Sequence, residues 1–236
     1  MPGAPREDVE RLQPGLASVI VAAPVIVAAS FIGFLWAPET RFATKWLLLE
    51  NQPVQLLTFL ALAAGGLLGL ALAWRARRNG AGAMVFVFYA VFSAGLLFTA
   101  MEEVAWGQWF FGFETPPALE RINRQDEMTL HNIRGIHGHS EYFRVAFAVG
   151  GLLGLCLSLW PRARDIAVPP LLASWFLVIA VLAGLDLVLD YYPFHRYFYR
   201  TIGVHMSEVV EMLIGFAALL YVRLNWTRLH AGWKGG

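Results

Sequence analysis

Long apolar runs, interrupted by short charged stretches, dominate the amino-acid sequence. A helix needs about 20 apolar residues to cross the hydrocarbon core of a bilayer. Runs of this kind occupy residues 16–37, 54–74, 83–101, 142–160, 170–189 and 201–221. They are continuous rather than alternating, and lipid offers no partner for unpaired backbone amides, so helices are favoured over strands. The pattern predicts an all-α polytopic transmembrane bundle of about six helices.

The composition agrees with one membrane domain over residues 1–236. Hydrophobic residues make up 58% of the chain and charged residues 15%, whereas soluble domains carry about 25% charge. The formal net charge of +1 provides no basic field for nucleic acid, and the sequence has no nucleic-acid motif. Cys156 is the single cysteine, so we expect neither an intrachain disulfide nor a cysteine-based metal site.

Glycines recur at helix-packing spacing in two of the predicted helices. Gly65 and Gly69 are four residues apart in the second helix, and Gly150 and Gly154 are four apart in the fourth. Small residues at this spacing allow the backbones of neighbouring helices to approach closely. We therefore expect both pairs to face another helix.

Basic residues favour one side of the membrane. Arg75, Arg77 and Arg78 crowd the loop after the second helix, and Arg162 and Arg164 lie in the loop after the fourth. An excess of Lys and Arg marks cytoplasmic loops. Six crossings place both termini on this same side. We predict a protein of a bacterial inner membrane with cytoplasmic N- and C-termini.

The connection of residues 104–141 then faces outward as a re-entrant or interfacial segment. Residues 118–133 are polar enough for a short interfacial helix between the third and fourth membrane helices. In such a helix Asn123, Glu127 and His131 share one face, because they are spaced at i, i+4 and i+8. Glu127 and His131 are then spaced to hold one cation.

Acidic and imidazole side chains gather at the predicted outer ends of the membrane helices. They are Glu102 and Glu103 at the end of the third helix, Asp186 near the end of the fifth, and His205, Glu208 and Glu211 at the start of the sixth. Charges near a bilayer are costly and usually face a polar interior. The inner halves of the helices are almost purely apolar. We expect the outer groups to converge on one pocket.

Imidazole together with carboxylate is a ligand set for zinc, iron or manganese. We predict His131, His205 and Glu208 as ligands of a divalent metal, with Glu127 as a further ligand. Two neighbouring carboxylates also suit general acid–base work, since they can share a proton.

The predicted catalytic set lies beside these ligands. Glu103 is the general base for a metal-bound water, with Glu102 adjacent to it in the same set. Gln108 and Asn132 orient the substrate or the ligands. Glu211 and Asp186 are further members of the pocket. In the alternative interpretation, the acids pair with arginines of the outer loops and only close the outer surface.

A motif in the third helix and the outer connection resembles the signature of a family of bacterial polytopic membrane proteins. It consists of Glu102-Glu103, Gly107-Gln108, Thr115-Pro116, Asn123, Gln125, Glu127 and His131-Asn132. The resemblance implies a multi-pass helical fold and brings no established activity with it.

Three functions fit the one-sided distribution of charge. The first is a metal-dependent, hydrolase-like membrane enzyme that acts on a lipid or lipid-linked substrate at the outer face. The second is a cation- or proton-coupled transporter that uses Asp186, Glu208 and Glu211 as a relay. The third is a non-catalytic accessory subunit of a membrane complex. Membrane lipid is the expected partner, and the sequence identifies no protein partner.

Overall fold

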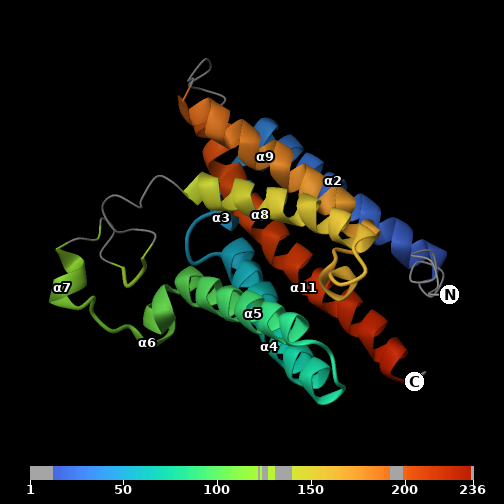
Figure 1. Cartoon of the computed structure of the whole chain (residues 1–236). Helices are drawn as coiled ribbons and strands as arrows, with labels where there is room; N and C mark the ends of the chain where they lie inside the picture. Colours follow the sequence, from blue (N-terminus) through green and yellow to red (C-terminus); the bar gives the residue numbers. More distant parts are fainter. Residues whose placement is uncertain (1–12, 122, 124–126, 131–139, 192–198, 235–236) are drawn as a thin grey trace.

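The computed structural model describes residues 13–121, 123, 127–130, 140–191 and 199–234, and these parts are helical with no strand (Figure 1). The α-helices are α2 (Pro14–Trp36), α3 (Pro38–Leu47), α4 (Pro53–Arg78), α5 (Ala83–Glu103), α6 (Gln108–Phe111), α7 (Pro117–Glu120), α8 (Ser140–Cys156), α9 (Ala173–Tyr191) and α11 (Val204–Lys234). Short turns of 3₁₀ helix are η1 (Ala105–Gly107), η2 (Leu157–Leu159), η3 (Arg164–Ile166) and η4 (Pro170–Leu172). A short π-helix, η5 (Tyr199–Gly203), precedes α11.

Six of these helices are long and apolar enough to cross a membrane, namely α2, α4, α5, α8, α9 and α11. The predicted all-α polytopic bundle is confirmed, and the chain is an integral membrane protein. Prolines open α2, α3 and α4, where a missing backbone N–H costs no helical hydrogen bond. The last helix runs well past the predicted residue 221, because Val222 and Asn225 are buried against the rest of the bundle.

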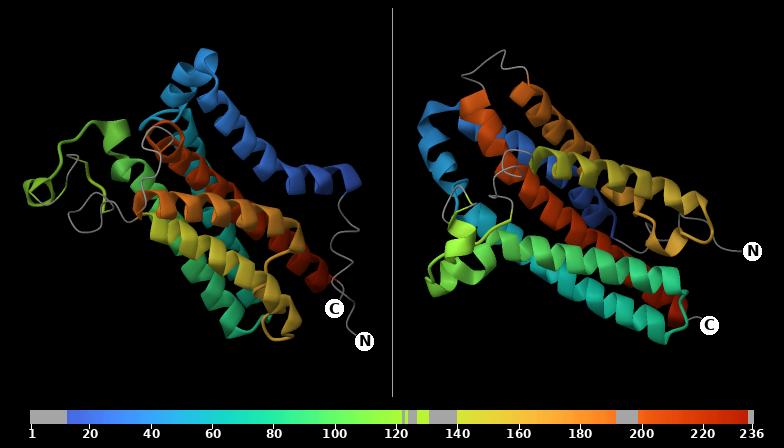
Figure 2. Two further views of the ribbon diagram at one scale, coloured as in Figure 1. Left: turned by 90° about the horizontal axis from the view of Figure 1, so that it is seen from above. Right: turned by 60° about the vertical axis from the view of Figure 1, so that its left-hand side comes forward.

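Helix α11 is the centre of the bundle and contacts α2, α4, α8 and α9. Helix α4 packs along both α5 and α11, while α8 packs along α9 (Figure 2). The start of α2, the end of α11 and the α4–α5 turn lie at one end (Figure 1). We call this the basic end, because Arg75, Arg77 and Arg78 close α4 there. The opposite end, where α5 ends and α11 begins, is the acidic end.

Glycines make close helix contacts at both sites predicted, with one change of residue. A Cβ on Gly65 would lie 3.3 Å from the backbone of Leu219 in α11, and one on Gly69 would lie 2.1 Å from Ser93 Oγ in α5. In α8, however, Gly150 has nothing within 4 Å of such a Cβ. The prediction for Gly150 was wrong, because the face of α8 that packs on the neighbouring chain carries Gly151 and Gly154 instead.

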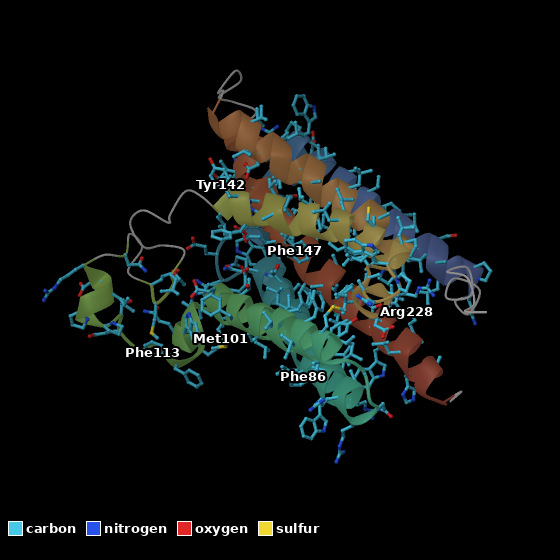
Figure 3. All side chains as sticks on the ribbon, in the orientation of Figure 1. Phe86, Met101, Phe113, Tyr142, Phe147 and Arg228 are labelled. Carbon is cyan, nitrogen blue, oxygen red and sulfur yellow. The ribbon has the colours of Figure 1, made fainter. Side chains whose placement is uncertain are left out.

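The basic end is not purely apolar, contrary to expectation. Tyr89 of α5 and Tyr221, Asn225 and Arg228 of α11 donate side-chain hydrogen bonds to the backbone carbonyls of residues 164–167, at 2.6 to 3.2 Å. Figure 3 places Arg228 on α11 beside this segment. Buried carbonyls need such partners. The bonds fasten the α8–α9 connection to the bundle, and only the folded chain reveals them.

Replacing Gly151 by alanine tests the contact between α8 and α9. The added Cβ would lie 1.9 Å from the Phe176 ring, so we expect a loss of about 1–3 kcal/mol from overpacking. Gly150→Ala is the matched control, because its Cβ meets open space and alanine is the better helix former. Thermal unfolding in detergent should show a lower Tm for G151A only. Equal Tm values for the two variants would contradict the packing.

Candidate functional site

Charged side chains from four helices meet at the acidic end. They are Glu103 of α5, Arg144 of α8, Asp186 of α9, and Glu208 and Glu211 of α11, and we call them the charge cluster. Glu103 lies within electrostatic range of Glu208 and Glu211. Glu208 in turn lies within range of Glu211 and Arg144. The sequence prediction that distant acids converge is thus supported for these members.

Arg144 is the cation of the cluster, and the sequence reasoning did not select it. Its side chain is buried, with the residue only 7% exposed. Arg144 Nη1 lies 3.3 Å from Asp186 Oδ2, and its Nε lies 3.9 Å from Glu211 Oε1. Its Nη2 donates a hydrogen bond to Ser140 Oγ at 2.8 Å. An arginine inside the predicted span 142–160 was the available signal, since intramembrane charges mark functional or paired positions.

Carboxyls outnumber guanidinium groups in the charge cluster. Glu103 is only 9% exposed, and several carboxylates next to one another in a buried place repel. An uncompensated buried charge costs several kcal/mol. One arginine cannot neutralise all the acids of the cluster. The arrangement therefore suits a site that retains protons on some carboxyls or that accepts a cation.

The backbone around Glu103 is held in place by Gln55 at the start of α4. Gln55 Nε2 donates to the Glu103 carbonyl oxygen at 3.1 Å, and Gln55 Oε1 accepts from Asn51 N at 2.9 Å. Directly after Glu103 the chain turns sharply, with positive φ at Ala105 (45°) and Trp106 (55°). Non-glycine residues avoid this region unless the surroundings impose it. The end of α5 is thus a tightly determined position for the Glu103 side chain.

Glu102 points into a different environment from its neighbour Glu103. Its Oε1 accepts a hydrogen bond from Trp106 Nε1 at 2.6 Å, and its Oε2 accepts one from Leu130 N at 2.8 Å. The carboxylate therefore ties the strained turn and the distal part of the outer connection to α5. This is the geometry of a positioning group.

Gln108 has a similar part in the outer connection. Its Nε2 donates to Thr115 Oγ1 at 3.0 Å, and its Oε1 accepts from Met128 N at 2.8 Å. Each such bond adds about 1 kcal/mol when the groups are shielded from water. Several motif residues of the connection thus bind one another.

The segment expected to form one interfacial helix over 118–133 does not do so in its described part. Only α7 (Pro117–Glu120) is helical there. Asn123 is buried, and its Nδ2 donates to the carbonyls of Glu127 and Thr129. Asparagine side chains that bond nearby carbonyls stabilise turns in place of helix. Glu127 therefore lies in a turn, and the i, i+4 argument for a shared helical face does not apply to it.

The predicted histidine ligands are not brought together in the described part of the chain. His131 and Asn132 lie outside the described residues. His205, at the start of α11, lies within electrostatic range of Lys45, whose ammonium group disfavours a metal cation beside it. Among the described residues no three His, Cys, Asp or Glu side chains are arranged to hold a metal ion. The metal set of the sequence analysis stays a prediction.

No model of a known protein family matches the chain, and comparisons with characterised proteins and with solved structures give no match either. The arguments below therefore rest on the geometry of the chain itself.

An apolar layer separates the charge cluster from the hydrogen bonds of the basic end. It is formed by Leu62 of α4, Leu96 and Ala100 of α5, and Ala218 of α11, all buried. Phe147 of α8 packs against it, and Figure 3 shows this residue on the side of α8 that faces α5. Polar groups at the two ends are thus not continuous through these helices in the described chain.

Replacing Gln108 by alanine tests the fastening of the outer connection. The variant loses the bonds to Thr115 and Met128, so the connection should open more often and be cut faster in limited proteolysis. We expect an increase of about three- to tenfold in the cleavage rate, in line with about 1 kcal/mol for a hydrogen bond. Glu120→Ala on exposed α7 is the control and should leave the rate unchanged. Equal rates for both variants would contradict the anchoring role.

Replacing Arg144 by methionine tests its place among the acids. The change leaves Asp186 and Glu211 without their buried cation, and removing one partner of a buried pair costs about 3–5 kcal/mol. We expect a large fall in Tm, with recovery of part of it when Asp186→Asn is added. Arg121→Met, at an exposed position, should have little effect. A Tm for R144M equal to that of R121M would show that Arg144 does not neutralise the cluster.

Proposed function

We propose that this chain is an integral membrane enzyme that carries out acid–base chemistry, of a hydrolase-like kind, on a lipid or lipid-linked substrate. The observation that supports it is the meeting of Glu103 with Glu208 and Glu211 from a separate helix, at one end of the bundle only. Two carboxyls that share protons are the usual means of moving a proton to and from a reacting group.

In this proposal Glu103 is the general base and Glu208 is the general acid. Glu103 takes a proton from water as the water oxygen forms its bond to the substrate carbonyl or phosphoryl centre. Glu208 gives a proton to the leaving oxygen as the old bond breaks. Arg144 holds Asp186 and Glu211 in place beside them. Positioned proton transfer of this kind is worth about 10²–10⁴-fold in rate.

The location of the cluster supports a lipid substrate. Its members lie on the end turns of helices that span the bilayer, so a substrate that stays in the membrane can reach them. The apolar layer of Leu62, Leu96, Ala100 and Ala218 favours chemistry at one face over transport. A transporter needs a polar route that continues toward the other face.

Cation binding by the same acids is the second candidate, and the excess of carboxyls over guanidinium groups favours it. Oxygen ligands from Glu103, Glu208 and Glu211 suit Mg²⁺, Ca²⁺ or Mn²⁺. A zinc or iron site of the kind expected from the sequence would need His131 as well.

The acidic end faces outward in this proposal. Arg75, Arg77 and Arg78 lie at the end that also holds the start of α2 and the end of α11. Because basic residues collect on the cytoplasmic side, both termini are placed in the cytoplasm. For a bacterial protein the membrane is then the inner membrane.

Neutralising the two acids tests the enzymatic proposal. Membranes that contain the wild-type protein are incubated with a total lipid extract, and lipid species are followed by mass spectrometry. Wild-type protein should convert at least one lipid species, and Glu103→Gln or Glu208→Gln should slow that conversion by about 100-fold or more. Glu120→Gln on exposed α7 is the matched control and should retain the rate.

No conversion by folded wild-type protein, or full conversion by E103Q and E208Q, would overturn the enzymatic proposal. Calorimetric titration of the purified protein with Mn²⁺ addresses the second candidate. Stoichiometric binding that is lost in E103Q and E208Q, without any lipid conversion, would favour cation binding in its place.

A further inference from the structure

A short helix lies across the acidic end between two membrane-spanning helices. Helix α3 (Pro38–Leu47) has ten residues, too few to cross a bilayer. Its Phe42 is 86% exposed and its Trp46 is 49% exposed, and the two lie one turn apart on the same face. Exposed aromatic residues on a short amphipathic helix are typical of the membrane–water interface. Helix α3 is thus placed at the level of lipid headgroups.

The junction of α2 and α3 is held by side chains that bond the last carbonyls of α2. Thr40 Oγ1 donates to the Phe34 carbonyl at 2.8 Å. Arg41 donates from Nε to the Leu35 carbonyl at 2.9 Å and from Nη2 to the Trp36 carbonyl at 2.7 Å. The guanidinium group of Arg41 is therefore committed to a structural role, and α3 is fixed relative to α2.

Lys45, on the next turn of α3, has no such commitment. It forms no hydrogen bond or ion pair within the described residues. It is half-buried and lies within electrostatic range of His205 of α11. His205 Nδ1 is buried and likewise has no hydrogen-bond partner among the described residues. Two nitrogen groups without acceptors thus face each other at the headgroup level.

The surroundings of His205 differ from those of the charge cluster. The electrostatic neighbours of Glu208 are Glu211, Arg144 and Glu50, whereas the one that acts on His205 is Lys45. Buried donors without acceptors are rare in proteins, because leaving them unsatisfied costs free energy. An anion between Lys45 and His205 would satisfy both groups and relieve their repulsion. Phosphate oxygens accept such charge-assisted hydrogen bonds well.

We propose that Lys45 and His205 bind the phosphate of an anionic phospholipid headgroup at the junction of α3 and α11. The exposed rings of Phe42 and Trp46 lie along the acyl chains of the same leaflet, and Lys45 and His205 take the headgroup. The site uses neither Glu103 nor Glu208, so it does not depend on the proposed acid–base chemistry.

Native mass spectrometry of the purified protein tests this site by counting retained lipids. The protein is exchanged from detergent into equal amounts of phosphatidylglycerol and phosphatidylcholine. Wild-type protein should retain phosphatidylglycerol in preference, and Lys45→Gln or His205→Gln should weaken that retention by about tenfold each. Arg121→Gln, which removes an exposed charge from the same end of the molecule, is the matched control and should retain the lipid like wild type.

Size-exclusion chromatography confirms that each variant is folded before the comparison. Equal retention of the two lipids by wild-type protein, or unchanged retention by folded K45Q and H205Q, would overturn the proposal. Glycerol phosphate, added at the same concentration as the lipid, separates a headgroup in the membrane from a free phosphate. Displacement of the lipid by this soluble compound would also overturn the assignment to a phospholipid.

Discussion

The neutralisation of buried acids at one end of the bundle is the constraint on which this structure depends. Arg144 reaches from α8 to Asp186 on α9 and Glu211 on α11, so one guanidinium group links three membrane helices. Hydrocarbon surroundings contribute little to helix association, because lipid tails are as apolar as the helices themselves. Specific polar contacts and close packing at glycines then decide which helices are neighbours.

The two ends of the bundle use polar groups in opposite ways. At the basic end, tyrosine, asparagine and arginine side chains bond backbone carbonyls of residues 164–167, and each donor is paired with an acceptor. At the acidic end, carboxyls from α5 and α11 face one another and exceed the cation beside them. The first arrangement stabilises a connection. The second leaves chemistry to be done, which is why the proposed function is assigned to the acidic end.

Adjacent residues of the sequence motif have separate tasks in the fold. Glu103 joins the charge cluster, whereas Glu102 accepts hydrogen bonds from Trp106 and Leu130. Gln108 and Asn123 likewise bond other parts of the outer connection. A motif rich in polar residues looks catalytic throughout when only the sequence is read. The hydrogen bonds divide it into a scaffold and one carboxyl that faces the other helices.

The sequence by itself determined the six membrane-spanning helices and the side on which the acids gather, because both follow from apolar length and from the alternating direction of successive crossings. It could not decide which acid faces which partner. The pairing of Arg144 with Asp186, the choice of Gly151 over Gly150, and the separation of His205 from Glu208 all depend on how each helix is rotated about its axis. That rotation is set by packing against neighbours distant in the sequence, so only the tertiary structure decides it.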